Sequence, residues 1–443
     1  MEKYDVVIIG SGPAGMFAAL ELVKLKPNIK IAIFERGTDR PPDEKENLTS
    51  GWGGAGAFSD GKLTLSSAVG GQLIDFIDED EFNDLANYVD SKYIEFGGEK
   101  KLFNASSSEI EKLKRKALAA NLNLITFKVR HLGTDKSRNI VLGIKRHLEE
   151  KGIKIFINSE AKEIINSGKL AVKTNNQEVK ADKIIVATGR GGAEWFFEQA
   201  KNLGLKLKNN GVDVGVRIEV PSETLKEITD LLYELKVIYY SRAHDDKIRT
   251  FCMCPNGFVA IENYRGLMTV NGHSFKNKKS PNTNFAVLVS QTFTEPFNDP
   301  ISYGRYVSGL ANLLGGKVLV QRLGDLKNGR RSTDARMRAG FVKPTLAEAT
   351  PGDLSLAIPH RHLSGIMEML EALEKIAPGV ASKHTLLYGT EVKFYSNQVE
   401  TVRGFETKIP GLYVAGDGSG YTRGLLQSSM QGVIVARNIA NKI

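Results

Sequence analysis

The sequence is poor in cysteine and has no long hydrophobic segment, and both absences exclude whole classes of protein. Only two cysteines occur among 443 residues, too few for a disulfide-rich scaffold or a cysteine-rich structural zinc site. No apolar run reaches the ~18 residues that a membrane-spanning helix needs. An apolar strand follows the first few residues directly, so we expect no signal peptide. The scarcity of cysteine is typical of a reducing compartment and favours a cytoplasmic location.

The composition is that of a folded globular chain with a positive charge. Hydrophobic residues make up 41% and charged residues 25%, which excludes disordered and coiled-coil classes. The net charge is +9, but Lys and Arg are spread along the chain without a dense basic face that includes interleaved aromatics. We therefore expect no nucleic-acid partner. Glycine, with 44 residues, is more abundant than usual and directs attention to glycine-dependent loops.

The first 35 residues show the pattern of a dinucleotide-binding βαβ unit. Residues 4–9 are almost wholly apolar and rich in β-branched side chains, which predicts a buried strand. The segment Gly10-Ser11-Gly12-Pro13-Ala14-Gly15 follows, then helical spacing over residues 16–26, and then a second apolar strand that ends at Glu35. Strand, glycines, helix, strand and acid in this order predict one dinucleotide site at the N-terminus.

Each residue type in this motif has a physical reason. Gly10 permits the tight turn out of the strand, and Gly12 lets a pyrophosphate approach the backbone. Gly15 lets the helix pack closely on the sheet, while the helix N-terminus offers N–H groups to the phosphates. The carboxylate of Glu35 is suited to accept hydrogen bonds from a ribose diol.

Two further glycine-rich segments resemble this motif without its context. Residues 51–56 follow a polar stretch instead of a strand, and we interpret them as a flexible loop. Gly189-Arg190-Gly191 follows a good strand, but Glu194 stands where the third glycine belongs. We therefore expect one bound dinucleotide and no second complete dinucleotide domain.

The remaining pattern predicts an α/β protein with a second, inserted domain. Residues 212–220 alternate strictly between apolar and other side chains, which is typical of an antiparallel sheet with one solvent-exposed face. Residues 248–254 and 258–261 flank Pro255-Asn256-Gly257 and predict a hairpin. A strand at 412–415, a glycine-rich turn and a helix at 425–441 repeat the Rossmann-like pattern at the C-terminus.

The simplest architecture is a Rossmann-like nucleotide domain built from both chain ends, with an inserted α+β substrate domain that contains an antiparallel sheet. The expected boundaries are residues 1–74, 129–204 and 396–443 for the nucleotide domain, 75–128 for a helical insertion and 205–395 for the substrate domain.

Three motifs in this order carry a family resemblance. The N-terminal glycine motif, Ile185-Val186-Ala187-Thr188-Gly189 and Gly411-Leu412-Tyr413-Val414-Ala415-Gly416-Asp417 together resemble the glutathione-reductase-like FAD flavoproteins. Residues 53–63, 130–135, 215–219, 249–255 and 416–424 are similar to a family of bacterial and archaeal FAD-dependent dehydrogenases over nearly the whole chain. Asn256 and His273 depart from that family's pattern in the substrate domain.

The resemblance implies non-covalently bound FAD. It gives Asp417 a contact with the ribityl chain, and it aims the N-terminus of the following helix at the flavin pyrimidine ring, where reduced flavin is negative. NAD(P)H is a candidate transient electron donor. The residues that we expect to bind the cofactor are Gly10, Gly12, Pro13, Ala14, Gly15, Glu35, Arg36, Gly54, Ala55, Gly56, Lys62, Ala161, Ala187, Thr188, Gly189, Gly416, Asp417, Gly424 and Leu425.

Five side chains are candidates for the chemistry. Lys393 lies on a strand expected to return toward the flavin, and Arg423 precedes the last helix, where its cation suits an acidic substrate or the reduced flavin. His131 is a candidate general base. Cys252 and Cys254 are two apart on a strand, so both sulfurs should face one side, too widely spaced for an unstrained disulfide. We expect at least one of these sulfurs to reach the flavin-facing cavity.

We expect no metal site. His360 and His362 would face one way on a strand, but no third ligand lies near them in the sequence. The leading function is an FAD-dependent oxidoreductase that transfers a hydride between flavin N5 and a small substrate, for which an anionic compound is a candidate. The alternatives are a tRNA-modifying flavoprotein and a lipid saturase of the geranylgeranyl-reductase type, which would need a basic face and a strongly apolar substrate domain, respectively. The oligomeric state is not predicted.

Overall fold

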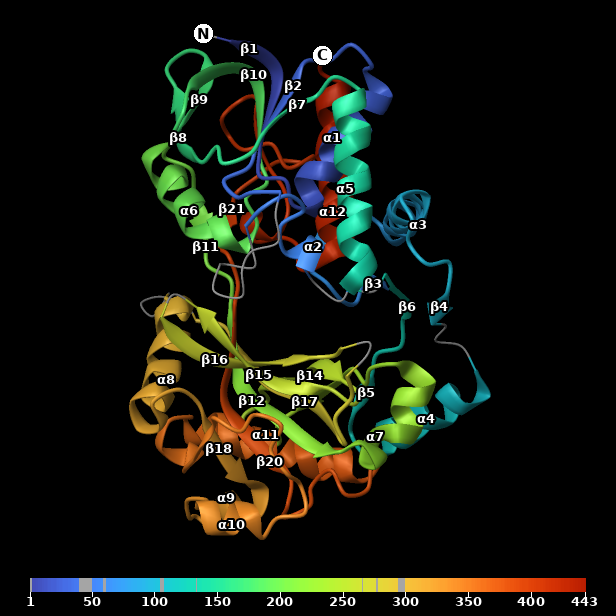
Figure 1. The fold of residues 1–443 in the computed structure, drawn as a ribbon, viewed down its shortest axis with the longest axis vertical. Helices are drawn as coiled ribbons and strands as arrows, with labels where there is room; N and C mark the ends of the chain where they lie inside the picture. The colour runs from blue at the N-terminus through green and yellow to red at the C-terminus, as the bar shows by residue number, and fades with distance from the viewer. Residues whose placement is uncertain are drawn as a thin grey trace. The chain divides into compact units, whose positions relative to one another are not determined.

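The computed structural model describes residues 2–39, 50–58, 61–103, 107–132, 134–264, 266–275, 278–293 and 299–443. The chain folds into two compact units (Figure 1). The first contains residues 1–102, 127–210 and 395–443, and the second contains residues 103–126 and 211–394. The expected helical insertion, residues 75–128, is therefore divided between the two units and does not form a body of its own.

The first unit is an α/β structure. Its helices and strands are β1 (Lys3–Ile9), α1 (Pro13–Leu25), β2 (Ile31–Phe34), α2 (Ala55–Phe58), β3 (Lys62–Leu65), η1 (Leu73–Asp75), α3 (Glu79–Glu95), β6 (Lys128–His131), α5 (Thr134–Glu150), β7 (Lys154–Phe156), β8 (Ala161–Asn166), β9 (Leu170–Thr174), β10 (Glu178–Val186), η2 (Arg190–Gly192), α6 (Ala193–Asn202), β11 (Leu207–Lys208), β21 (Gln398–Val399), β22 (Leu412–Val414), η4 (Asp417–Ser419) and α12 (Leu425–Ala440). The short strand β4 (Leu102–Phe103) spans a boundary between the units.

The main sheet of the first unit joins both ends of the chain. Its strand order is β7-β2-β1-β10-β9-β8, and β22 pairs with β10. β22 and β1 both run parallel to β10, so the C-terminal strand joins the same sheet as the N-terminal one. α1 and α12 pack against each other (Figure 1), and a Cβ at Gly432 of α12 would collide with the carbonyl oxygen of Ala14.

The second unit is built on one large sheet. Its helices and strands are α4 (Ser108–Ala119), β5 (Asn123–Leu124), β12 (Val212–Pro221), α7 (Ser222–Leu232), β13 (Val237–Tyr240), β14 (Lys247–Cys254), β15 (Phe258–Tyr264), β16 (Leu267–His273), β17 (Asn282–Gln291), α8 (Pro300–Gly315), β18 (Leu319–Arg322), α9 (Leu323–Lys327), α10 (Asp334–Arg338), β19 (Thr350–Pro351), η3 (Leu354–Leu356), α11 (His360–Glu374) and β20 (Leu386–Phe394). The strand order of its sheet is β19-β18-β20-β12-β17-β14-β13-β5.

The expectation of a solvent-exposed face on β12 is wrong. All residues of β12 except Pro221 are buried, including the charged side chains of Asp213, Arg217 and Glu219. β12 lies in the middle of the sheet, between β17 and β20, and the hairpin of β15 and β16 contacts it on one side. The alternation in the sequence therefore separates an apolar core face from a buried polar face.

The expected hairpin around Pro255-Asn256-Gly257 is also wrong. β14 pairs with β13 and β17, whereas β15 pairs with β16 to form a separate two-stranded sheet. The turn after β14, with Asn256 at φ +50°, leads the chain out of the large sheet.

His360 and His362 begin helix α11, so the expectation that they share one face of a strand does not apply. His362 is 2% exposed and His360 is exposed. Among the described residues, no group of three His, Cys, Asp or Glu side chains is placed to hold a metal ion. In the same part of the chain, no helix is both long and apolar enough to cross a membrane.

The burial of His362 predicts a pH dependence of stability. Burial, opposed by Asp246 and assisted by Arg361, lowers the pKa of His362 to about 4. Because the unfolded chain binds this proton with a pKa near ~6.5, stability is lost as the pH falls from about 6.5 toward 4. When the pH is lowered from 7 to 4.5, the unmodified protein should lose free energy of unfolding because of this histidine. His362→Gln lacks the histidine, so its loss over the same pH range should be smaller by about 2–3 kcal/mol.

Chemical unfolding at the two pH values measures this difference, and the exposed His360→Gln variant is the matched control. An identical pH dependence in His362→Gln and the unmodified protein would contradict the assignment.

Candidate functional site

The loop between β1 and α1 has space for a ligand at one of its three glycines. Gly10 has φ +101°, and a Cβ there would lie 2.5 Å from the carbonyl oxygen of Ala187. A Cβ at Gly15 would overlap the carbonyl oxygen of Gly10, whereas a Cβ at Gly12 would meet nothing within 4 Å. Two of the glycines are thus needed by the protein's own packing, and the third leaves an opening at the start of α1.

The C-terminal motif lies against this opening. Gly416 has φ +76°, and a Cβ there would lie 2.9 Å from the Cβ of Ala14. Asp417 follows, and its Oδ1 accepts a hydrogen bond of 2.7 Å from the Ser428 hydroxyl in the first turn of α12. The Nε of Arg190 lies 3.7 Å from Asp417 Oδ2. The two ends of the chain therefore place two helix N-termini and one carboxylate in the same region.

The glycine-rich segment at 51–56, interpreted above as a flexible loop, is part of this region. Its last two residues begin helix α2, and Gly51 to Gly54 are buried. A Cβ at Gly56 would lie 3.0 Å from the Leu425 side chain and 3.1 Å from that of Pro13. Gly56 thus packs between the first residues of α1 and α12, and the interpretation of residues 51–56 as a loop is wrong for its last two residues, which are helical.

Glu35 holds the surrounding loops together. Its Oε2 accepts hydrogen bonds from the Ser11 amide (3.1 Å) and the Ser11 hydroxyl (2.7 Å), and its Oε1 accepts from the amides of Gly37 (2.9 Å) and Gly51 (3.0 Å). A carboxylate offers about four lone-pair sites, so all of them are engaged. The contact with a ribose diol that the sequence predicts would require one of these bonds to open.

The region fits FAD. Gly12, Gly189 and Gly424 each leave a Cβ position with nothing within 4 Å. Among the buried polar atoms that have no hydrogen-bond partner within the described residues, two lie beside these glycines. They are Thr188 Oγ1, next to Gly189, and Nε2 of Gln431, whose Oε1 accepts the Gly416 amide at 2.8 Å. Open backbone beside helix N-termini suits a pyrophosphate, and a polar ligand relieves the cost of unpaired buried donors.

The remaining expected cofactor-binding and catalytic residues of the first unit lie on several elements. Lys62 of β3 pairs in register with His131 of β6. Arg36 donates to the carbonyl oxygen of Gly191 at 3.3 Å. Ala187 follows β10, and Ala161 begins β8 at the far side of the sheet. Arg423 lies over the ring of Tyr395, 3.5 Å from its centroid.

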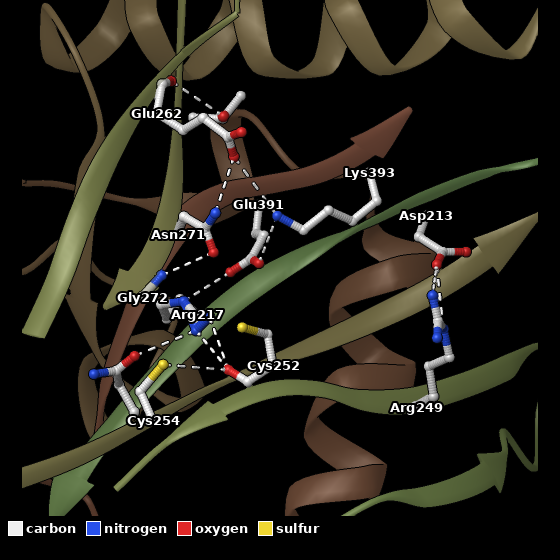
Figure 2. Close-up of polar contacts among 12 residues, drawn as sticks. Asp213, Arg217, Arg249, Cys252, Cys254, Glu262, Asn271, Gly272, Glu391 and Lys393 are labelled. Atoms are coloured by element: carbon white, nitrogen blue, oxygen red, sulfur yellow. Dashed lines mark hydrogen bonds and ion pairs between the residues drawn. The ribbon is translucent and has the colours of Figure 1, made fainter. Parts of the chain in front are cut away.

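The second unit contains a buried charged cluster on the polar face of its sheet (Figure 2). Arg217 of β12 is fully buried, and its Nε lies 3.0 Å from Glu391 Oε2 on β20. Lys393 lies 3.0 Å from the other oxygen of Glu391 and 3.8 Å from Glu262 on β15. Burial acts to lower the pKa of Arg217, but the charge of Glu391, with smaller contributions from Cys254 and Cys252, raises it above its usual value.

Arg217 also holds an irregular part of β14. Its two terminal nitrogens donate to the carbonyl oxygen of Cys252 at 3.1 and 3.0 Å. Cys252 has φ +41°, and the register of β14 against β17 shifts between Phe251 and Cys254. A β-bulge re-aims side chains, so the expected two-residue alternation of the cysteines does not hold: Met253 and Cys254 are both buried, whereas Cys252 is half-buried.

The structure thus gathers Lys393, Cys252 and Cys254 around Arg217 in the second unit, and it places His131 and Arg423 in the first. Sequence reasoning missed Arg217 and Glu391 as site residues. Their signal was present: Asp213, Arg217 and Glu219 alternate on β12, and β20 contains Glu391 and Lys393 at the same spacing. Complementary charges on two strands of a buried sheet indicate cross-strand pairs.

The chain matches two protein families. Residues 5–217 match the family described as FAD dependent oxidoreductase. Residues 211–394 match the family described as FAD-dependent protein, C-terminal domain-like, and this range coincides with the larger segment of the second unit. The two matched ranges together span residues 5–394, and the chain is an FAD-dependent oxidoreductase with segments similar to both families.

Relatives and solved structures were also found. A protein of Clostridium beijerinckii, described as uncharacterized, is 27% identical over 99% of this chain and 81% of its own length. Thiamine thiazole synthase 4 of Physcomitrium patens is 35% identical, over 20% of this chain and 22% of its own. The structure of glycine oxidase from Geobacillus kaustophilus gives a TM-score of 0.42 at 15% identity, covering 100% of this chain and 95% of its own. The structure of L-proline dehydrogenase from P. horikoshii gives a TM-score of 0.45 at 14% identity, covering 100% of this chain and 94% of its own.

The glycine geometry predicts opposite outcomes for two substitutions. Gly12→Val places its side chain in open space, so the variant should fold but lose its yellow colour, with a thermal stability close to that of the unmodified protein from which the flavin has been removed. Gly15→Ala forces a Cβ into backbone and should lower the free energy of unfolding by about 1–3 kcal/mol or more. Flavin absorbance and thermal unfolding measure both effects. A yellow Gly12→Val protein would contradict the placement of the pyrophosphate.

The buried ion pair predicts a strong coupling. Arg217→Met leaves the Glu391 carboxylate buried beside Lys393 alone and should lower the free energy of unfolding by about 3–5 kcal/mol. The double variant Arg217→Met/Glu391→Gln should be less destabilised than Arg217→Met alone, because no unpaired carboxylate remains. Denaturant titrations of the single and double variants measure the coupling, and strict additivity of the two effects would argue against it.

Proposed function

We propose that this FAD-dependent oxidoreductase transfers a hydride between flavin N5 and a small substrate with an anionic group. The observation that supports the cofactor half of this proposal is the approach of Gly416 and Asp417 to the opening at Gly12, which brings two motifs from opposite ends of the chain together. When bound, FAD supplies the two-electron couple that accepts or gives the hydride.

The chain's own residues would hold the cofactor by complementary charge. The backbone at Gly12 and the N-terminus of α1 would bind the pyrophosphate. Asp417, positioned by Ser428 and Arg190, would accept hydrogen bonds from the ribityl hydroxyls. The N-terminus of α12 carries a partial positive charge, which stabilises negative charge on the reduced pyrimidine ring. The order of the three motifs supports the finer assignment to glutathione-reductase-like flavoproteins.

We assign the anionic group of the substrate to Lys393. Its side chain is 10% exposed, and Glu391 and Glu262 lie on two sides of its ammonium group, so its position is well defined. A hydrogen bond from a lysine ammonium group to an anion is charge-assisted and therefore stronger than one between neutral groups. The experiment below screens for the substrate and tests NAD(P)H as electron donor.

The test is anaerobic stopped-flow reduction of the purified yellow protein with NADH, NADPH and a panel of small carboxylic acids. We expect at least one compound to bleach the flavin. For that compound, Lys393→Met should raise KM about 10- to 150-fold through loss of a charge-assisted hydrogen bond, and Lys393→Arg should restore part of it. Lys375→Met, at an exposed position, is the matched control. An unchanged KM in Lys393→Met would contradict the assignment of Lys393 to the substrate site.

A further inference from the structure

One segment of the second unit concentrates positive charge. Residues 322–343 contain five Arg and two Lys against two Asp, so a twentieth of the chain holds more than half of its net charge of +9. The segment runs from the end of β18 through α9 and α10, which lie at one end of this unit (Figure 1). The sequence pattern conceals the cluster, because only Arg330 and Arg331 are adjacent and the other basic residues are separated by one to four others.

The guanidinium groups in this segment are held in fixed positions. Asp325 is fully buried, and its carboxylate lies 2.9 Å from Arg330 Nε, 3.3 Å from Arg322 Nε and 3.7 Å from Arg336 Nε. Arg322 donates to the carbonyl oxygen of Arg336 at 2.7 Å, and Arg336 donates to that of Arg331 at 2.9 Å. One buried carboxylate thus organises three cations, and the chain between them is fixed.

Further cations surround this centre without acidic partners. Arg331, Arg338 and Lys343 are exposed, and within the described residues none forms an ion pair; Lys343 Nζ donates to the carbonyl oxygen of Arg338 at 2.7 Å. Lys383 joins them, because its carbonyl oxygen accepts the Gly324 amide at 3.1 Å. Burial, with the charges of Lys383 and Arg322, lowers the pKa of His384. These cations repel one another, so a polyanion is the partner that suits them.

An exposed aromatic ring lies among the cations. Phe341 is 83% exposed, and its ring centroid lies 4.2 Å from that of His384, which supports it from one side. The neighbouring apolar side chains Met337 and Val342 are buried, so the surface offers a single ring and no apolar face that would insert into a membrane. A supported ring surrounded by arginines is the arrangement on which nucleic-acid bases stack.

We propose that a basic surface formed by Arg330, Arg331, Arg338, Phe341, Lys343 and Lys383 binds single-stranded nucleic acid. The cations contact phosphates, with arginine favoured over lysine because its planar fork fits a phosphate with two hydrogen bonds. Phe341 stacks on one base. This interaction goes beyond the oxidoreductase activity and replaces the expectation, drawn from the sequence, that the chain has no basic face with an aromatic residue.

The test uses the full flavin-loaded chain and fluorescence anisotropy of a labelled single-stranded RNA of about 20 nucleotides, from 50 to 200 mM salt. We expect saturable binding with a log–log salt slope of about −2 to −4, for three to five phosphates at roughly −0.7 each. Arg331→Ala/Arg338→Ala should weaken binding about 10-fold or more and reduce the slope by about 1.4. Phe341→Ala should weaken it about 5- to 150-fold with the slope unchanged.

The matched control is Lys151→Ala/Lys154→Ala, which removes two exposed cations from the first unit and should change the affinity by less than about twofold. Flavin content and circular dichroism confirm that each variant is folded. No saturable binding, or an equal loss in the control variant, would overturn the proposal. The proposal would also be overturned if duplex DNA or vesicles of anionic phospholipid bound as tightly as the single strand and Phe341→Ala did not change the affinity.

Discussion

The first unit depends on one constraint, the close packing of the first turn of α1 against the β1–α1 loop and helix α12. Gly15 packs against the carbonyl oxygen of Gly10, and Gly432 of α12 packs against that of Ala14. Side chains at either glycine would separate the helices from the β1–α1 loop. Because the contacts are this close, the remaining glycine, Gly12, faces open space, and the N–H groups at the start of α1 stay accessible to a phosphate.

A different constraint acts in the second unit, where charges are buried on the polar face of a central strand. Burying Arg217, Glu391 and Glu219 costs free energy unless each finds partners. Arg217 has Glu391, Asn284 and the Cys252 carbonyl, and Glu219 accepts from Tyr388, Thr345 and Asn282. Burial and the adjacent Glu219 raise the pKa of Tyr388 well above its usual value, so the phenol remains a donor. Such networks fix one register of the sheet, which suits a surface that must present Lys393 and the bulge at Cys252 in defined positions.

The sequence predicted the elements of the first unit well because local signals determine them. The βαβ unit at the N-terminus and the β22–α12 return follow from apolar periodicity and from glycines whose roles are steric. The errors concern features that depend on tertiary contacts. The alternation in β12 does not reveal that a β15–β16 hairpin covers its polar face, and Pro255-Asn256-Gly257 marks a turn without saying which strand pairs next. Gly56 packs against Pro13 and Leu425, which are remote from it in the sequence. The basic surface is assembled by Asp325, whose burial no local pattern indicates.

The central claim is that one FAD binds without a covalent bond across the start of α1 and the Gly416–Asp417 turn. The most direct measurement is chromatography of the flavin released when the purified protein is denatured, together with its molar ratio to the chain. We expect the released flavin to be FAD, in a ratio that approaches one per chain, and the denatured polypeptide to be colourless. Release of FMN, or flavin that stays attached to the denatured chain, would contradict it.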